Sequence, residues 1–119
     1  MKICFSATGK DKDSLLDTRF GRCPFFWVYD EEKKEWQMKE NEGMTAFRGA
    51  GVVAAQVVVD LGCQVVISGN MGPNAFRVLS AAGVKIYQGN SQKKVVENLK
   101  DYQAGKLNLF TAPLVGRQW

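Results

Sequence analysis

Residues 65–87 read VVISGNMGPNAFRVLSAAGVKIY, and this stretch decides the fold class. Two short apolar runs, 65–68 and 84–87, flank a helical pattern at 75–82 that Gly83 ends. Each run has the length and composition of a strand buried on both faces, which is typical of a parallel sheet. A strand–helix–strand unit joins such strands by a right-handed crossover. The stretch therefore predicts an α/β fold with at least two parallel strands.

Three further strands are predicted upstream, and no helical pattern separates them. They are residues 1–6, 24–30 and 35–40. In the first of them, Ile3 and Phe5 face one side of the sheet and Cys4 faces the other, because side chains alternate along a strand. Strands that follow one another without a helix are expected to pair antiparallel.

Two more helices are predicted, one before and one after the opening unit. Gly49–Leu61 is apolar nearly throughout and long enough for a buried helix, although its β-branched residues leave a strand possible. Thr45 is the candidate N-cap of this helix, and Gly62 is its C-terminal glycine. Ser91 is expected to cap the last helix, which runs to about Ala104.

The predicted order of elements is βββαβαβα. Its most economical arrangement is a mixed five-stranded sheet of order 3-2-1-4-5 with helices on both faces, the three-layer α/β layout of ribonuclease H-like domains. Residues 1–107 are expected to form this single domain, and residues 108–119 a C-terminal tail. Strand order changes direction between strands 1 and 4, so loops 7–23 and 69–77 are expected to meet at one ligand-binding crevice.

The composition excludes several kinds of function. The 119 residues carry a formal charge of +4 without a basic run, so nucleic-acid binding is not expected. No stretch approaches the roughly 20 apolar residues of a membrane span, and no signal peptide opens the sequence, so a cytoplasmic protein is expected. The chain contains no histidine, which excludes histidine metal sites and Ser–His or Cys–His catalysis. Neither 1–6 nor 65–68 contains an acid, which argues against a two-metal nuclease.

The loop that ends in Arg19-Phe20-Gly21-Arg22-Cys23 is the first candidate binding segment. Guanidinium groups beside a glycine that lets the backbone bend suit an oxyanion or a sulfide-rich anionic cluster. A solvated turn with Phe20 in the core remains the alternative. Cys23 is the candidate metal ligand, because the neighbouring positive charge is expected to lower the pKa of its thiol.

Two other motifs contribute candidates to the same crevice. One motif contains Arg48, Gly49 and Gly51, and the other contains Gly69, Gly72 and Asn74. The second motif opens a predicted helix, whose free amide groups attract anions. The small residues of the first would let a ligand approach the backbone. Close packing of the first motif and a tight turn in the second remain the alternatives.

The remaining cysteines, Cys4 and Cys63, are expected to behave as small buried hydrophobes. Three scattered cysteines do not supply the four ligands of a standard iron–sulfur site.

These motifs, in this order, resemble the dinitrogenase iron–molybdenum cofactor biosynthesis domain family over about residues 1–107. The segments that carry the resemblance are Asp17-x-Arg19-Phe20-Gly21-Arg22, an aromatic strand ending in Asp30, Gly49-x-Gly51, Gly69-x-x-Gly72-Pro73-Asn74-Ala75-Phe76 and Ala82–Tyr87. The resemblance implies a ribonuclease H-like fold without nuclease activity. It also implies a site built from residues of the three motifs, namely Arg19, Gly21, Arg22, Gly49, Gly51, Gly69, Gly72 and Asn74.

The resemblance further implies a carrier of an anionic metal–sulfur cluster, either the iron–molybdenum cofactor or a precursor, or a molybdenum–sulfide cluster. Members of the family often have a histidine where this chain has Arg48, so coordination through imidazole is not available here. The protein is expected to be a non-catalytic carrier or store whose partners are the cluster and the proteins that donate or accept it. The alternatives are a protein-interaction or regulatory module, with the aromatic residues of 110–119 docking a partner, and a redox enzyme that depends on Cys23.

Overall fold

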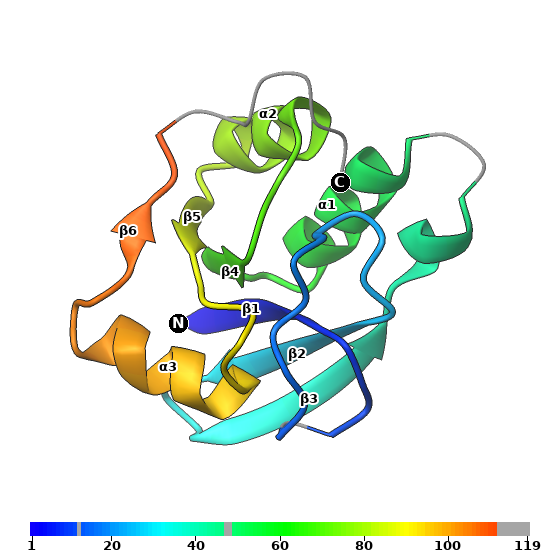
Figure 1. Ribbon diagram of the computed structural model, residues 1–119. Helices are drawn as coiled ribbons and strands as arrows, with labels where there is room; N and C mark the ends of the chain where they lie inside the picture. The colour runs from blue at the N-terminus through cyan, green and yellow to red at the C-terminus, as the bar shows by residue number, and fades with distance from the viewer. Residues whose placement is uncertain (12, 47–48, 112–119) are drawn as a thin grey trace.

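The computed structural model describes residues 1–11, 13–46 and 49–111. It contains one mixed sheet with helices on both faces (Figure 1). The strands are β1 (Lys2–Ala7), β2 (Phe25–Asp30), β3 (Glu35–Glu40), β4 (Val65–Ser68), β5 (Lys85–Gln88) and β6 (Asn108–Leu109). The helices are α1 (Ala50–Asp60), α2 (Pro73–Ala81), α3 (Val95–Gln103) and a short 3-10 helix, η1 (Glu42–Thr45).

The strand order is β3-β2-β1-β4-β5-β6. The first three strands pair antiparallel, and the β1–β4 and β4–β5 pairs are parallel, which confirms the predicted ribonuclease H-like arrangement. The predicted count of five strands is wrong by one. A sixth strand, β6, pairs antiparallel with Tyr87 and Gln88. β6 has only two residues, so it is too short to show an alternating hydrophobic pattern in the sequence.

β6 lies in the segment expected to be a tail. The next residue, Phe110, packs against the core, and its N–H donates to the Ile86 carbonyl at 2.7 Å. Residues 112–119 lie outside the described part of the chain, and so does most of the segment expected to dock a partner.

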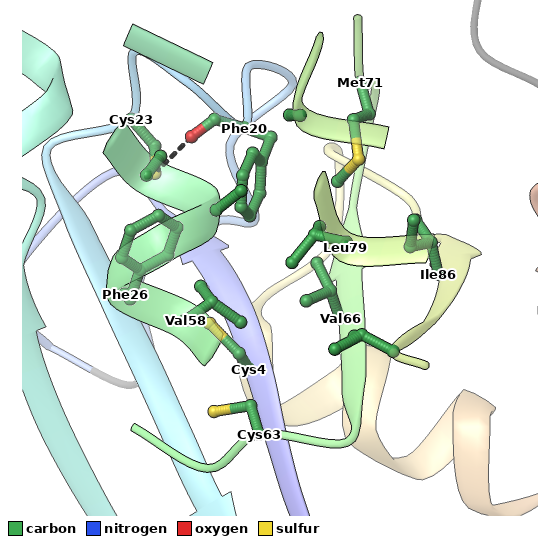
Figure 2. Close-up of a cluster of buried hydrophobic side chains, with 14 of the residues drawn as sticks. Cys4, Phe20, Cys23, Phe26, Val58, Cys63, Val66, Met71, Leu79 and Ile86 are labelled. Carbon is green, nitrogen blue, oxygen red and sulfur yellow. Dashed lines mark hydrogen bonds between the residues drawn. The ribbon is translucent and has the colours of Figure 1, made fainter. Parts of the chain in front are cut away.

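The sheet separates two hydrophobic clusters. Cys4 points toward α1 and α2, in a cluster that also contains Phe20, Phe26 and Leu79 (Figure 2). Ile3 and Phe5 point toward α3, as the predicted alternation along β1 requires. The protein is therefore a three-layer α/β/α domain. Within the described residues, the longest helix has 11 residues, and no helix could cross a bilayer.

The C-terminal ends of the three helices follow the predicted glycine pattern. Gly62, Gly83 and Gly105 come directly after the C-cap residues of α1, α2 and α3, and each has a positive φ. Glycine favours this left-handed conformation, which closes a helix.

Both predicted N-caps are wrong. Thr45 lies inside η1, and α1 begins instead after Gly49, whose φ of 69° and ψ of 29° are left-handed. Lys94, rather than Ser91, precedes α3. The segment before α3 is held by Asn90 instead, whose side-chain oxygen accepts the Gln92 N–H at 2.9 Å.

Candidate anion-binding site

The two loops at the carboxyl ends of β1 and β4 meet, as the topology predicts. The Gly69 N–H donates to the Asp17 carbonyl at 3.2 Å. A Cβ atom on Gly69 would lie 2.8 Å from the Cα of Thr18, so a larger residue would force the loops apart. Gly69 is therefore required for the contact between the loops and need not touch a ligand.

Two buried serines near the ends of β1 and β4 form hydrogen bonds with the two loops that meet. Ser6 is the penultimate residue of β1, and Ser68 ends β4. Their hydroxyl oxygens are 2.8 Å apart. The hydroxyl of Ser6 lies 2.9 Å from the Asp17 carbonyl, and that of Ser68 lies 3.1 Å from the Asn70 carbonyl. The pair was not among the predicted residues, although hydroxyls at the carboxyl ends of adjacent parallel strands are a signal that could have found it.

The buried Asp17 carboxylate shapes the arginine turn. Asp17 is 4 % exposed, and its Oδ1 accepts the backbone N–H of Arg19 at 2.8 Å. The Nε of Arg19 lies 3.4 Å from the same oxygen, while the Arg19 side chain remains 49 % exposed. Arg19 therefore keeps a guanidinium group that solvent, or an anion, can reach.

Arg22, in contrast, has a structural role. Its Nη1 donates to the carbonyls of Met44 and Ala46, at 3.1 and 2.8 Å, at the end of η1. Asn41 makes a second link to the same loop, because its Nδ2 donates to the carbonyls of Gly21 and Cys23 at 3.1 and 2.8 Å. Arg22 and Asn41 thus hold the arginine loop against η1. Gly21, whose carbonyl accepts from Asn41, is buried.

The expected thiolate at Cys23 is not found. Cys23 is fully buried, and its Sγ donates to the Phe20 carbonyl at 3.2 Å (Figure 2). Burial raises the pKa of this thiol, and the negative charge of Asp17 adds to the rise. Arg19 acts in the opposite direction but more weakly. The prediction of a lowered pKa at Cys23 is therefore wrong, because desolvation outweighs the opposing charge of Arg19.

In the native protein near pH 8, we expect a maleimide reagent to leave Cys23 unmodified. A thiol reacts as its thiolate, and a raised pKa leaves almost none of it at this pH. Peptide mapping by mass spectrometry after a short exposure checks this, with the urea-unfolded protein as the control in which Cys23 reacts. Rapid labelling of native Cys23 would contradict the placement and would support the redox-enzyme alternative.

The N-termini of α1 and α2 lie at the same edge of the sheet as these loops. α1 leads into the start of β4 and α2 follows its end, so both helices begin at the carboxyl end of that strand (Figure 1). The first turn of each helix contains no acidic residue. The first amides of a helix have no intrahelical partner, and the helix dipole is positive there, so both ends favour anions.

Four of the predicted glycine and asparagine residues lie at these helix starts. Gly49 precedes α1 and Gly51 lies in its first turn, while Gly72 precedes α2 and Asn74 lies in its first turn. Gly49 and Asn74 are exposed, and Gly72 is buried. Arg48 lies outside the described residues.

Protein ligands for a metal ion are scarce at this edge. In residues 1–11, 13–46 and 49–111, no three His, Cys, Asp or Glu side chains lie together as a possible ion site. An anion here would be held by amide groups and guanidinium charge rather than by a set of coordinating side chains.

The fold is that of a ribonuclease H-like α/β domain, with a candidate anion-binding edge at the carboxyl ends of β1 and β4. The chain belongs to the dinitrogenase iron–molybdenum cofactor family, whose sequence model matches residues 1–105. This confirms the family resemblance noted in the sequence.

Solved structures and a curated relative agree with this assignment. The apo form of the orange protein from Desulfovibrio gigas is 33 % identical, with a TM-score of 0.91 and 95 % of each chain covered. A NifB-like protein from Thermotoga is 31 % identical, with a TM-score of 0.86 and 98 % of each chain covered. An uncharacterized protein of Methanocaldococcus jannaschii is 31 % identical over 101 residues, which covers 82 % of this chain and 85 % of the relative.

Proposed function

We propose that the protein binds and carries an anionic metal–sulfur cluster at the edge formed by the arginine loop and the starts of α1 and α2. The cluster would be related to the iron–molybdenum cofactor or its precursor, or would be a molybdenum–sulfide. The family membership supports this class of cargo. The protein would act in the cytoplasm, receiving the cluster from one protein and passing it to another.

The observation that carries the proposal is that two helix N-termini and one arginine lie at the same edge of the sheet. Two acid-free helix starts and the half-exposed Arg19 lie there. Each contributes hydrogen-bond donors that suit sulfide or oxo groups. The net charge of +4 favours an anionic cargo in the same direction.

We further propose that the protein holds its cargo without turnover. A carrier must release its cluster, and binding through amides and an exposed guanidinium group is reversible by nature. The buried Cys23 thiol fits this role better as part of the core than as a permanent ligand.

The test is retention of a cluster by the purified protein. The apo-protein is incubated anaerobically with iron–molybdenum cofactor, its iron–sulfur precursor or tetrathiomolybdate, desalted, and analysed for molybdenum, iron and sulfide. We expect about one cluster per chain for at least one of the three. If none is retained, while the orange protein treated in parallel retains molybdenum, the proposal is wrong and the interaction module becomes the leading hypothesis.

A further inference from the structure

Two cysteines that the proposed function does not use lie together in the core. Cys4 belongs to β1, and Cys63 lies two residues before the start of β4, in the same hydrophobic cluster (Figure 2). Figure 2 shows the two thiols side by side at the end of the cluster away from Met71. Cys4 lies two residues before Ser6, so the pair is set back from the anion-binding edge toward the amino ends of the strands.

The two thiols lie close enough to shift each other's pKa. The neighbouring Cys4 thiol lowers the pKa of Cys63, and the positive charge of Lys2 lowers it further. Burial raises the pKa of Cys4, and the neighbouring Cys63 thiol adds to the rise. Cys63 is therefore the first of the two thiols to ionise.

Access to the pair is one-sided. Cys63 is 5 % exposed and Cys4 is fully buried. Lys2 is near the exposed side, where its Nζ donates to the Leu61 carbonyl at 3.3 Å. An incoming ion would meet the Cys63 sulfur first, and the Cys4 sulfur behind it would complete the coordination.

We propose that Cys4 and Cys63 form a two-thiolate site for a soft monovalent metal ion of the Cu(I) or Ag(I) class. Thiolate sulfur is the ligand that such ions prefer, and a closed-shell monovalent ion is satisfied by two of them. Structural zinc needs four ligands. In the described residues, no third His, Cys, Asp or Glu side chain joins the pair.

The binding step balances in charge. One monovalent cation replaces the two thiol protons, giving a bis-thiolate complex of charge −1 and two protons released to solvent. No electrons move. The Lys2 ammonium group lies close enough to Cys63 to offset part of the negative charge left in the apolar cluster. This site goes beyond the proposed cluster site, because it takes a cation, uses other residues and lies away from the anion-binding edge.

The experiment is an anaerobic titration of the fully reduced apo-protein with Cu(I) in competition with bicinchoninate, repeated with Ag(I). We expect one ion per chain, a thiolate-to-metal absorption band in the ultraviolet, and X-ray absorption showing two sulfur ligands. Cys63→Ala should weaken binding at least 100-fold. Cys23→Ala is the matched control, since it removes a buried thiol of the same cluster, and it should leave binding unchanged.

Cys63 lies at the margin of the core, so Cys63→Ala is expected to fold. This variant alone is sufficient for the test if Cys4→Ala does not fold. Equal binding by Cys63→Ala and the unmodified protein would overturn the proposal. So would a third sulfur or a nitrogen ligand in the absorption spectrum, or a loss of free thiols without bound metal, which would mean a disulfide instead. Retention of tetrathiomolybdate by Cys63→Ala, with loss of Cu(I), would separate this site from the cluster site.

Discussion

Replacing Arg19 by glutamate is expected to lower the affinity for tetrathiomolybdate, or for whichever cluster is retained, by at least about tenfold, equivalent to about 1.4 kcal/mol. The Arg19 side chain is half-exposed at the edge where α1 and α2 begin. The change replaces an attractive charge with a repulsive one. A surface charge is screened over about 8 Å at physiological ionic strength, so the loss should shrink as salt is added.

Two further variants separate charge from structure at this position. Arg19→Gln removes the positive charge without adding a negative one beside Asp17, and should lose less affinity than Arg19→Glu. Lys100→Glu makes the same charge change on α3, across the sheet, and should have little effect. Equal losses for Lys100→Glu and Arg19→Glu would show that only net charge matters and would remove Arg19 from the site.

Replacing Phe20 by alanine is expected to lower the free energy of unfolding by about 3–5 kcal/mol. Phe20 lies in the arginine loop, yet its ring is fully buried, 5.3 Å from the ring of Phe26. The cavity would lie directly beneath the turn that Asp17 shapes. Urea unfolding, followed by circular dichroism, measures the loss.

The matched control is Phe25→Ala, in the neighbouring β2. Phe25 is only half-buried and packs at the margin of the other cluster, so its removal should cost clearly less. Equal losses for the two variants would mean that the Phe20 ring does not hold the arginine loop in the core.

The strand order can be predicted from the sequence because the hydrophobic pattern of each strand is clear. The alternation of Ile3, Cys4 and Phe5 across β1 and the apolar runs of β4 and β5 fix which faces are buried. The meeting of the two loops follows from topology alone, since strand order reverses between β1 and β4. Family motifs add the likeness to the dinitrogenase iron–molybdenum cofactor family but do not assign a role to any one side chain.

What the sequence does not reveal depends on tertiary contacts. The pKa of Cys23 depends on whether its sulfur is buried or faces solvent, and the nearby Arg19 and Arg22 in the sequence cannot show this. Arg22 was expected at the ligand, but its guanidinium group caps η1, an element too short to predict. The Cys4–Cys63 pair joins residues 59 positions apart, so no local pattern signals it.

NMR titration can locate the bound anion on the protein. Backbone amide shifts of ¹⁵N-labelled apo-protein are followed during anaerobic titration with tetrathiomolybdate. We predict that the largest shifts fall in three segments, residues 17–23, 49–53 and 69–77, with Gly51 and Asn74 among them, while α3 is unchanged. Saturable shifts confined to α3 or to the β2–β3 hairpin, or no shifts at all, would contradict an anion-binding edge at the carboxyl ends of β1 and β4.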